Sequence, residues 1–462
     1  MESPTLDSAA TAQDLQRRLR DLQRSARAPG IAAAIVRDGA LTWSDSAGLA
    51  DVDGGVVPTL DTQYAIGSIT KTFTAVLLLQ LRDLGRLHLD DRLGEHLRGV
   101  AHGDVTLRSL LAHLSGLRRE PAAGPGGEIW ETLQDPGRDE LVAGVKRAGR
   151  VLEPGRRWHY SNLAFALLGE VVANSSGLAW EVALAERLLQ PLGMTRTTLE
   201  PVDPRARGYF VEPYSDMARP EPLLRLRGMA PAGQLWSTPA DLARWAAFLA
   251  DPDPGVLDPD SLAEARHPQV IADLEGWTLA WGLGLMLYRK GERILHGHAG
   301  GMPGFVSSVM AYDKDGEHAG VAVLANSTAG TDVEGLAADL LTTVLDAGAE
   351  EQPWRPSDPP PEAVAGLLGR WWSEGSEYIF SWRQGRLEAR AAMAGALRPR
   401  PPAVFRQLAA DVWTTVSGRE EGEELRAVRS PDGTVHRLYW ATYPYTRVPE
   451  VFGTPPDGAG AR

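Results

Sequence analysis

A serine and a lysine three residues apart, Ser68 and Lys71, form the pair in this chain best suited to chemistry. Only four of its 47 basic residues are lysines, so each lysine is a candidate for what arginine cannot do, which is to lose its proton. None of the other three follows a serine at this spacing. An amine one helical turn from a hydroxyl can take its proton. The spacing predicts a nucleophilic Ser68 activated by Lys71.

The neighbouring residues predict how this pair is positioned. Residues 61–67 are expected to form an extended segment that ends in a turn at Gly67. Apolar residues then follow Ser68 at helical spacing as far as Gly85. Positions i and i+3 share a helix face, so both side chains point the same way. Residues 75–79 are all apolar, which predicts a buried helix, and burial lowers the pKa of a lysine. The plainer alternative is a capping serine beside an unrelated lysine.

A second segment, residues 154–162, ends a loop and opens an apolar helix expected over 163–173. Its Tyr160 and Asn162 lie two residues apart in a turn, so both can face one cleft. A phenol can pass a proton between nucleophile and leaving group, and an amide can hold a substrate carbonyl. The alternative is a packing tyrosine beside an asparagine that caps the helix.

The third segment, residues 297–305, lies between strands expected at 293–296 and 306–312 and contains His298, Gly300 and Gly301. Glycines on a strand edge let a substrate lie against the backbone and expose N–H groups. One such N–H, with that of Ser68, could form an oxyanion hole. His298 could polarise the site or bind a carboxylate. The alternatives are a bulged hairpin and a loop histidine with satisfied hydrogen bonds.

Together the three segments resemble the motifs of the penicillin-recognising serine enzymes, which include class C β-lactamases, serine D-Ala-D-Ala carboxypeptidases and related esterases. Their order and separations match over roughly residues 15–345. The resemblance implies that Ser68 is acylated, that Lys71 activates it and that Tyr160 transfers protons. Asn162 would bind the substrate, and the backbone N–H groups of Ser68 and Gly301 would form the oxyanion hole.

His298 departs from the Lys-Thr-Gly motif that is typical of β-lactamases and carboxypeptidases. The lysine of that motif helps to hold a substrate carboxylate, and a neutral imidazole holds it less firmly at pH 7. The resemblance with this departure implies a serine hydrolase that acts on small esters or amides through an acyl-Ser68 intermediate, with weak or no β-lactamase activity. Two alternatives stay open: a thioesterase, acyltransferase or peptide cyclase that passes the acyl group to an amine, and a non-catalytic binding module.

The composition excludes several classes of partner and cofactor for this protein. The net charge of −13 argues against nucleic acid, and the absence of cysteine excludes disulfides and thiolate chemistry. His296 and His298 share a strand face, but no third ligand follows at recognisable spacing, so we expect neither a metal nor another cofactor. The first residues lack a secretory signal, and no apolar stretch is long enough for a membrane span. We therefore expect a cytoplasmic protein, without membrane contact, that acts on a small-molecule acyl substrate.

The length of 462 residues predicts two domains. Residues 1–350 are expected to form an α+β, serine β-lactamase/DD-peptidase-like domain, in which an antiparallel sheet is flanked by helices and a helical lobe. Prolines predict a stiff linker over 351–361. Short alternating runs over 362–462 predict a small all-β barrel or sandwich. The segment resembles the lipocalin-like C-terminal modules of some relatives, which implies a barrel. Tyr443, Tyr445 and Arg447 could reach towards the cleft; the alternative is a domain that only stabilises or dimerises the enzyme.

Overall fold

The computed structural model of the protein describes residues 9–122, 133, 137–314, 316–328, 330–348, 356, 359–392, 401–418 and 420–451. The chain divides into two compact units, Met1–Glu350 and Glu351–Arg462. Most of the linker predicted at 351–361 lies outside the described residues. The first unit contains all three sequence motifs.

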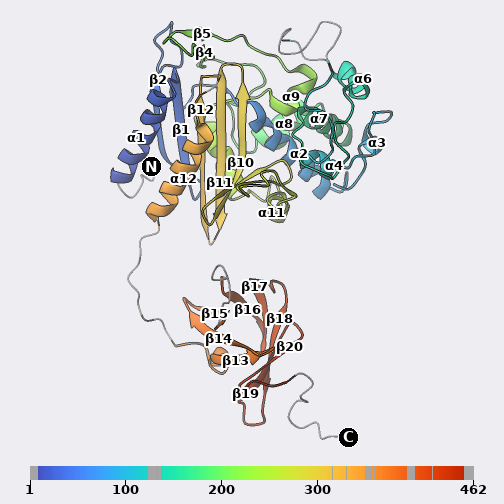
Figure 1. Ribbon diagram of the computed structural model, residues 1–462, viewed down its shortest axis with the longest axis vertical. Helices are drawn as coiled ribbons and strands as arrows, with labels where there is room; N and C mark the ends of the chain where they lie inside the picture. Colours follow the sequence, from blue (N-terminus) through green and yellow to red (C-terminus); the bar gives the residue numbers. More distant parts are fainter. Residues whose placement is uncertain are drawn as a thin grey trace. The chain divides into compact units, whose positions relative to one another are not determined.

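Strands from both ends of the first unit form one sheet, with the order β2-β1-β12-β11-β10-β9-β8-β7 (Figure 1). All neighbouring strands in it are antiparallel, which confirms the predicted sheet. The predicted hairpin between β1 and β2 turns through Asp38 and Gly39, both at positive φ. The strands are β1 (Gly30–Arg37), β2 (Ala40–Gly48), β7 (Val270–Ile271), β8 (Leu279–Trp281), β9 (Met286–Lys290), β10 (Arg293–Met302), β11 (Phe305–Lys314) and β12 (Glu317–Ala325).

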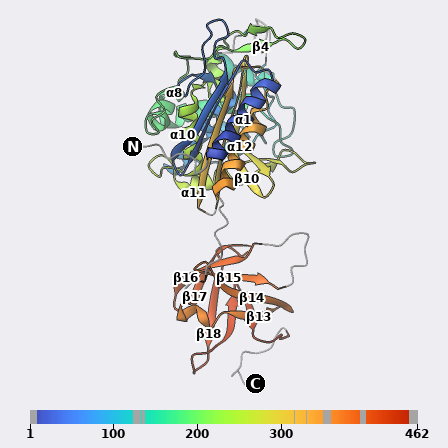
Figure 2. The same ribbon diagram turned by 90° about the vertical axis from the view of Figure 1, so that its left-hand side faces the viewer.

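Helices cover both faces of this sheet (Figures 1 and 2). The helices α1 (Ala9–Ser25) and α12 (Val333–Gly348) pack on one face, and α10 (Pro239–Ala250) packs on the other. Strand β1 serves both layers because successive side chains of a strand point to opposite faces. Ile31, Ala33 and Ile35 join the core under α1 and α12, whereas Ala32 and Ala34 join the larger core on the other side.

The larger core belongs to a helical lobe beside the sheet, centred on α2 (Thr70–Asp83). Every residue of α2 from Thr70 to Leu81 is buried, as the apolar run predicted, because α7 and α9 pack against it. The remaining elements are α3 (Leu93–His96), α4 (Leu107–Leu111), α6 (Arg138–Ala148), α7 (Asn162–Ser176), α8 (Trp180–Leu184), η2 (Ala185–Leu189), η3 (Arg227–Met229), α9 (Ala230–Gly233) and α11 (Pro259–Ala265), with the two-stranded pairs β3 (Tyr64–Ala65) with β6 (Trp236–Ser237) and β4 (Tyr209–Val211) with β5 (Ala218–Pro220).

No single helix among the described residues is long and apolar enough to cross a bilayer. One bent pair, Asn162–Ser176 with Trp180–Leu189, reaches that length and apolarity only when both helices are taken together.

The second unit is a closed antiparallel barrel of eight strands, which confirms the predicted all-β barrel. Large aromatic side chains fill it, among them Trp371, Phe380, Trp413 and Trp440. Its elements are α13 (Glu362–Ala365), β13 (Gly369–Ser373), β14 (Ser376–Arg383), β15 (Arg386–Ala391), β16 (Ala403–Ala409), β17 (Val412–Ser417), β18 (Glu424–Arg429), β19 (Val435–Trp440) and β20 (Tyr443–Thr446).

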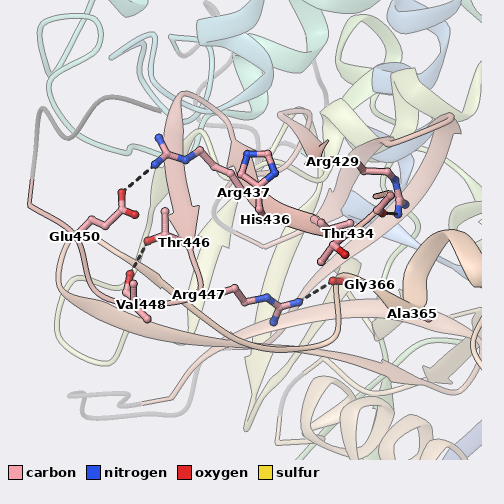
Figure 3. A pocket seen from close by; sticks show the side chains of 12 residues that line it. Ala365, Gly366, Arg429, Thr434, His436, Arg437, Thr446, Arg447, Val448 and Glu450 are labelled. Carbon is pink, nitrogen blue, oxygen red and sulfur yellow. Dashed lines mark hydrogen bonds and ion pairs between the residues drawn. The ribbon is translucent and has the colours of Figure 1, made fainter. Parts of the chain in front are cut away.

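Of the three side chains that we expected to reach towards the cleft, Tyr443 is exposed, and the other two are engaged within the barrel. Tyr445 is buried in its core. The Arg447 guanidinium lies 3.7 Å from the ring centre of Trp371 and donates to the Gly366 carbonyl at 2.7 Å. Through these two contacts Arg447 stabilises the start of β13. It also lines a barrel cavity of about 610 Å³, in which Arg437 pairs with Glu450 at 3.0 Å (Figure 3).

Candidate active site

Ser68 lies in the 3₁₀ turn η1 (Gly67–Ile69), directly before α2, and is half-buried. Gly67 has a φ of 50°, a conformation that favours glycine. Lys71 is fully buried one turn further on, and its Nζ lies 2.9 Å from Ser68 Oγ. The same Nζ donates to the Ala232 carbonyl at 2.6 Å. The structure therefore brings together the pair that the spacing predicted.

Burial lowers the pKa of Lys71 well below its ordinary value, because a charged amine loses its hydration there. The carboxylate of Glu120 opposes this shift, and the guanidinium of Arg119 reinforces it. A neutral amine has donors and one lone pair. Lys71 can thus donate to the Ala232 carbonyl and accept the Ser68 hydroxyl proton, which an ammonium cannot do.

The hydroxyl of Tyr160 forms a hydrogen bond with the Ser68 side chain. Burial raises the pKa of this phenol, so it keeps its proton in the resting site. Its ring packs 4.3 Å from the ring of His113 and lies 5.0 Å below Lys71 Nζ. On the outer side, the Arg119 guanidinium lies 4.8 Å from the ring centre. These contacts hold the phenol against the Ser68–Lys71 pair.

Asn162 is the first residue of α7, which Ser161 caps by accepting from Ala164 N. Its Nδ2 donates to Oε1 of Glu120 at 2.6 Å. The amide nitrogen has two N–H donors, so one remains for the substrate carbonyl that we expected Asn162 to hold, and this role stays a prediction. Within the described residues, Asn162 Oδ1 has no hydrogen-bond partner. Glu120 was not predicted, since nothing in its local sequence marks it.

Gly300 and Gly301 bring β10 against the turn that carries Ser68. The strand does not end at His296 as expected but continues through the glycines to Met302. A Cβ on Gly300 would lie 1.9 Å from the Ile66 carbonyl oxygen, and a Cβ on Gly67 would lie 2.8 Å from Gly301 N. The two backbones touch, so the Gly301 N–H lies close to Ser68. This placement suits an oxyanion hole.

His298 is buried, with 2% of its surface exposed, and packs edge-on against Trp281 and near Tyr160. Burial lowers its pKa to about 3, so the imidazole is neutral. Because β10 continues through the motif, strand alternation turns this side chain into the interior. The ring supports Tyr160 from within. Its Nε2 has no hydrogen-bond partner among the described residues, and both expected roles, polarising the site and binding a carboxylate, stay predictions.

His113 is a second buried imidazole that the sequence did not single out. It is fully buried, and its Nδ1 accepts from the backbone N–H of Ser161 at 3.0 Å. Its ring packs at a tilt against that of Tyr160, so it links the start of α7 to the phenol. A lone histidine in the otherwise apolar run 110–114 was the available signal.

The contact between β10 and the nucleophile turn predicts the behaviour of Gly300→Ala. Its methyl group would meet the Ile66 carbonyl, so β10 must move away from Ser68. We expect a loss of about 1–3 kcal/mol in the free energy of unfolding. We also expect slower acylation of Ser68, because the Gly301 N–H moves with the strand. Thermal unfolding and the rate of active-site labelling measure the two effects.

Gly301→Ala is the matched control for stability. A Cβ at this position has no atom within 4 Å, and Gly301 is not at positive φ. This variant is expected to keep the wild-type Tm. A Gly300→Ala protein with both the Tm and the labelling rate of the wild type would refute the contact.

Comparison with known proteins gives the family. The family model described as Beta-lactamase matches residues 15–344, and a domain of unknown function, DUF7586, matches residues 360–447. Penicillin-binding protein 4 of Amycolatopsis lactamdurans is 30% identical over 384 residues, which cover 78% of this chain and 97% of that protein. Several other curated relatives are matched over only 45–55% of their own length.

Two solved structures extend this comparison. The crystal structure of SurE is 26% identical, with a TM-score of 0.61, over 95% of this chain and 99% of that one. The D-amino acid amidase of Ochrobactrum anthropi SV3, complexed with L-phenylalanine amide, is 26% identical, with a TM-score of 0.61. The match covers 73% of this chain and 98% of that one. The chain thus belongs to the β-lactamase and penicillin-binding-protein family, as a serine β-lactamase-like hydrolase with a C-terminal eight-stranded barrel.

Proposed function

We propose that the protein hydrolyses small amides or esters through an acyl-enzyme formed on Ser68. The observation that carries the proposal is the 2.9 Å contact between Ser68 Oγ and a fully buried Lys71 whose pKa is lowered. Such a contact supplies a base for the hydroxyl at neutral pH. Relatives whose names specify amidase and carboxypeptidase activity support the same class of substrate.

Acylation would begin with transfer of the Ser68 hydroxyl proton to Lys71 Nζ. The Oγ–C bond then forms at the substrate carbonyl, and the carbonyl oxygen becomes an oxyanion that receives the N–H groups of Ser68 and Gly301. Collapse of this intermediate breaks the bond to the amine or alcohol. The leaving group needs a proton, which Tyr160 donates while Lys71 returns one to the phenol. Water then attacks the ester by the reverse route.

The two proton carriers have opposite pKa shifts, which supports a division of roles. Burial lowers the pKa of Lys71 and raises that of Tyr160. A neutral amine is a base and a neutral phenol is an acid, so Lys71 activates the nucleophile and Tyr160 protonates the leaving group. His298, neutral and buried, offers no cation for the carboxylate of a penicillin. We therefore propose weak or no β-lactamase activity.

Acyl transfer to an amine is the second candidate. The SurE structure solved with D-Leu covers 96% of this chain and so includes the barrel. The presence of a free amino acid with that protein is compatible with an amine that attacks an acyl-enzyme. Supplying an amine acceptor during ester turnover separates the candidates, since amide formed at the expense of acid favours transfer.

Active-site labelling tests the proposal. The full chain is treated with a fluorophosphonate, and a second sample is mixed with p-nitrophenyl acetate and quenched early. Mass spectrometry of the digests is expected to find both groups on Ser68 and on no other serine. Ser68→Ala is the control and is expected to stay unlabelled. A label on a different serine, or none with either reagent, would refute an acyl-Ser68 mechanism.

A further inference from the structure

A second cavity of the catalytic domain opens on the sheet beside the end of α10. This helix packs on β1, β11 and β12, and its end reaches β10, where the Leu249 carbonyl lies 2.9 Å from His296 Nε2. Beyond that contact, side chains of β7, β8 and β9 line a cavity of about 420 Å³. Pockets for small ligands have volumes of about 300–1,000 Å³. The cavity is therefore large enough for a small molecule.

The register of the strands gives this cavity an apolar floor. Ile271 pairs with Ala280, Ala280 with Leu287, and Leu287 with His296. Residues that pair across antiparallel strands point to the same face of a sheet, and all four line the cavity. Ile294, two residues before His296, lies on the same face and is 49% exposed. Burial lowers the pKa of His296 to about 3, so its imidazole adds no charge to the floor.

The loop between β7 and β8 forms one wall and holds a tryptophan towards solvent. The Asp273 carboxylate fixes the loop by accepting from Gly276 N at 2.9 Å and Thr278 Oγ1 at 2.7 Å. Trp277 has a φ of 53°, which bulky residues avoid, and its Nε1 donates to the Leu274 carbonyl at 2.9 Å. Trp277 is nevertheless 59% exposed. An indole that is held in place but left in water is available to pack on a ligand.

The charged residues around the cavity leave an excess of positive charge, on a chain whose net charge is −13. Asp313 forms an ion pair with Arg266, which neutralises both. Arg289 and Lys314 also line the cavity and form no ion pair among the described residues. Glu292 is the one other carboxylate among the described lining residues. One cation is therefore left without a counter-ion.

Arg289 is the cation that the register places next to the apolar floor. It pairs with Ile294, so the two side chains leave the sheet on the same face. Its one hydrogen bond among the described residues is weak, from Nε to the Gly291 carbonyl at 3.4 Å. A guanidinium that is exposed and unpaired beside an apolar surface suits a carboxylate that is attached to a hydrocarbon group.

We propose that this cavity is a binding site for an amphipathic monocarboxylate, such as a medium-chain fatty acid, separate from the active site. The hydrocarbon part covers Ile294 and the floor and packs against the Trp277 ring, and the carboxylate pairs with Arg289. Ile294 precedes Gly301 by seven residues of β10, roughly 20 Å along the strand. The ligand therefore leaves Ser68 free, and the inference goes beyond the proposed hydrolase function.

Three ligands test the inference by calorimetric titration of the full-length protein at neutral pH. Octanoate has both the hydrocarbon chain and the charge, 1-octanol lacks the charge, and acetate lacks the chain. All are kept below the concentrations at which octanoate forms micelles. We expect one octanoate to bind per chain, and 1-octanol and acetate to bind at least about 10-fold more weakly. Absence of octanoate binding, or equal binding of 1-octanol, would overturn the proposal.

Two variants locate the bound octanoate. Ile294→Asp puts a carboxylate where the hydrocarbon part lies, and we expect its Kd to rise by about 10-fold or more. Ile379→Asp, at a strand position of the barrel that is 41% exposed, is the matched control and should keep the wild-type Kd. Arg289→Gln should weaken octanoate by about 10-fold and leave 1-octanol unchanged, whereas Arg386→Gln, at an exposed position of β15, should change neither.

The remaining outcomes decide between a small ligand and a second copy of the chain. An unchanged Kd in Ile294→Asp would mean that octanoate binds elsewhere, which overturns the site. So would sedimentation that shows a wild-type dimer which Ile294→Asp converts to monomers, because the cavity would then be an interface. If Ile294→Asp does not fold, Trp277→Ala, a change at an exposed loop position, should also raise the Kd. None of these titrations depends on acylation of Ser68, so failure of the hydrolase proposal would leave the inference standing.

Discussion

Lys71→Met is expected to slow acylation of Ser68 by about 10²–10⁴-fold, because it removes the base and leaves the packing. Methionine has nearly the length of lysine and suits a fully buried position better than an amine does. The folded protein should therefore keep or raise its Tm. Loss of acylation without loss of stability would mean that Lys71 acts in the acylation step and not through the fold. Stopped-flow acylation by p-nitrophenyl acetate, with thermal unfolding, measures both.

Lys71→Arg tests the same role from the opposite side. Arginine keeps a positive charge and cannot be deprotonated in a protein, so it offers no lone pair to Ser68. We expect a loss of acylation as large as for Lys71→Met, here with a lower Tm, since a permanent charge is buried. Lys146→Met, on an exposed face of α6, is the control that should behave as the wild type. Wild-type acylation rates in both Lys71 variants would exclude the lysine as base.

The dependence of the Ser68 acylation rate on pH tests whether Lys71 acts in its unprotonated form. The amine is active when it is unprotonated, so the wild-type acylation rate should rise with pH as Lys71 loses its proton. Because burial lowers the pKa of Lys71 well below its ordinary value, the rise should be complete well below pH 10.5. In Lys71→Met this ascending limb should be missing. If the ascending limb persists in Lys71→Met, the titration of a different group produces it.

The placement of Ser68 and Lys71 was predictable because it depends on local structure. Three residues along a helix bring side chains to one face, and the apolar run after Ser68 buried the amine, as the sequence indicated. The alternating runs of the second domain likewise predicted strands, and the structure closes them into a barrel. A kinship with lipocalins stays a prediction, since the matching family is a domain of unknown function.

The rest of the site depends on contacts between distant segments. The Ala232 carbonyl that holds Lys71 comes from α9, 161 residues further along the chain, and Glu120 precedes Asn162 by 42 residues. Such contacts have no signature in a single sequence. The surroundings of His298 are another such case, because the Trp281 ring that packs against it belongs to β8. The role of His298 at the site stays a prediction.

Tyr160→Phe is expected to lower kcat/KM for amides and alkyl esters by about 10²–10⁴-fold, because it removes the acid that protonates the leaving group. The phenyl ring keeps its contacts with His113 and Trp281 and its position below Lys71 Nζ. The Tm should therefore stay close to that of the wild type. Tyr64→Phe is the matched control, since this nearby tyrosine is buried and its hydroxyl has no partner among the described residues.

The choice of substrate sharpens this test. p-Nitrophenolate leaves without a proton at neutral pH, whereas an amine or alkoxide leaves only after protonation. If Tyr160 donates that proton, the variant should lose far more activity on an amide or an ethyl ester than on a p-nitrophenyl ester of the same acid. Equal losses on both would mean that the phenol acts on Ser68 itself. The assignment of Lys71 as base and Tyr160 as acid would then be reversed, although the geometry around Ser68 would stand.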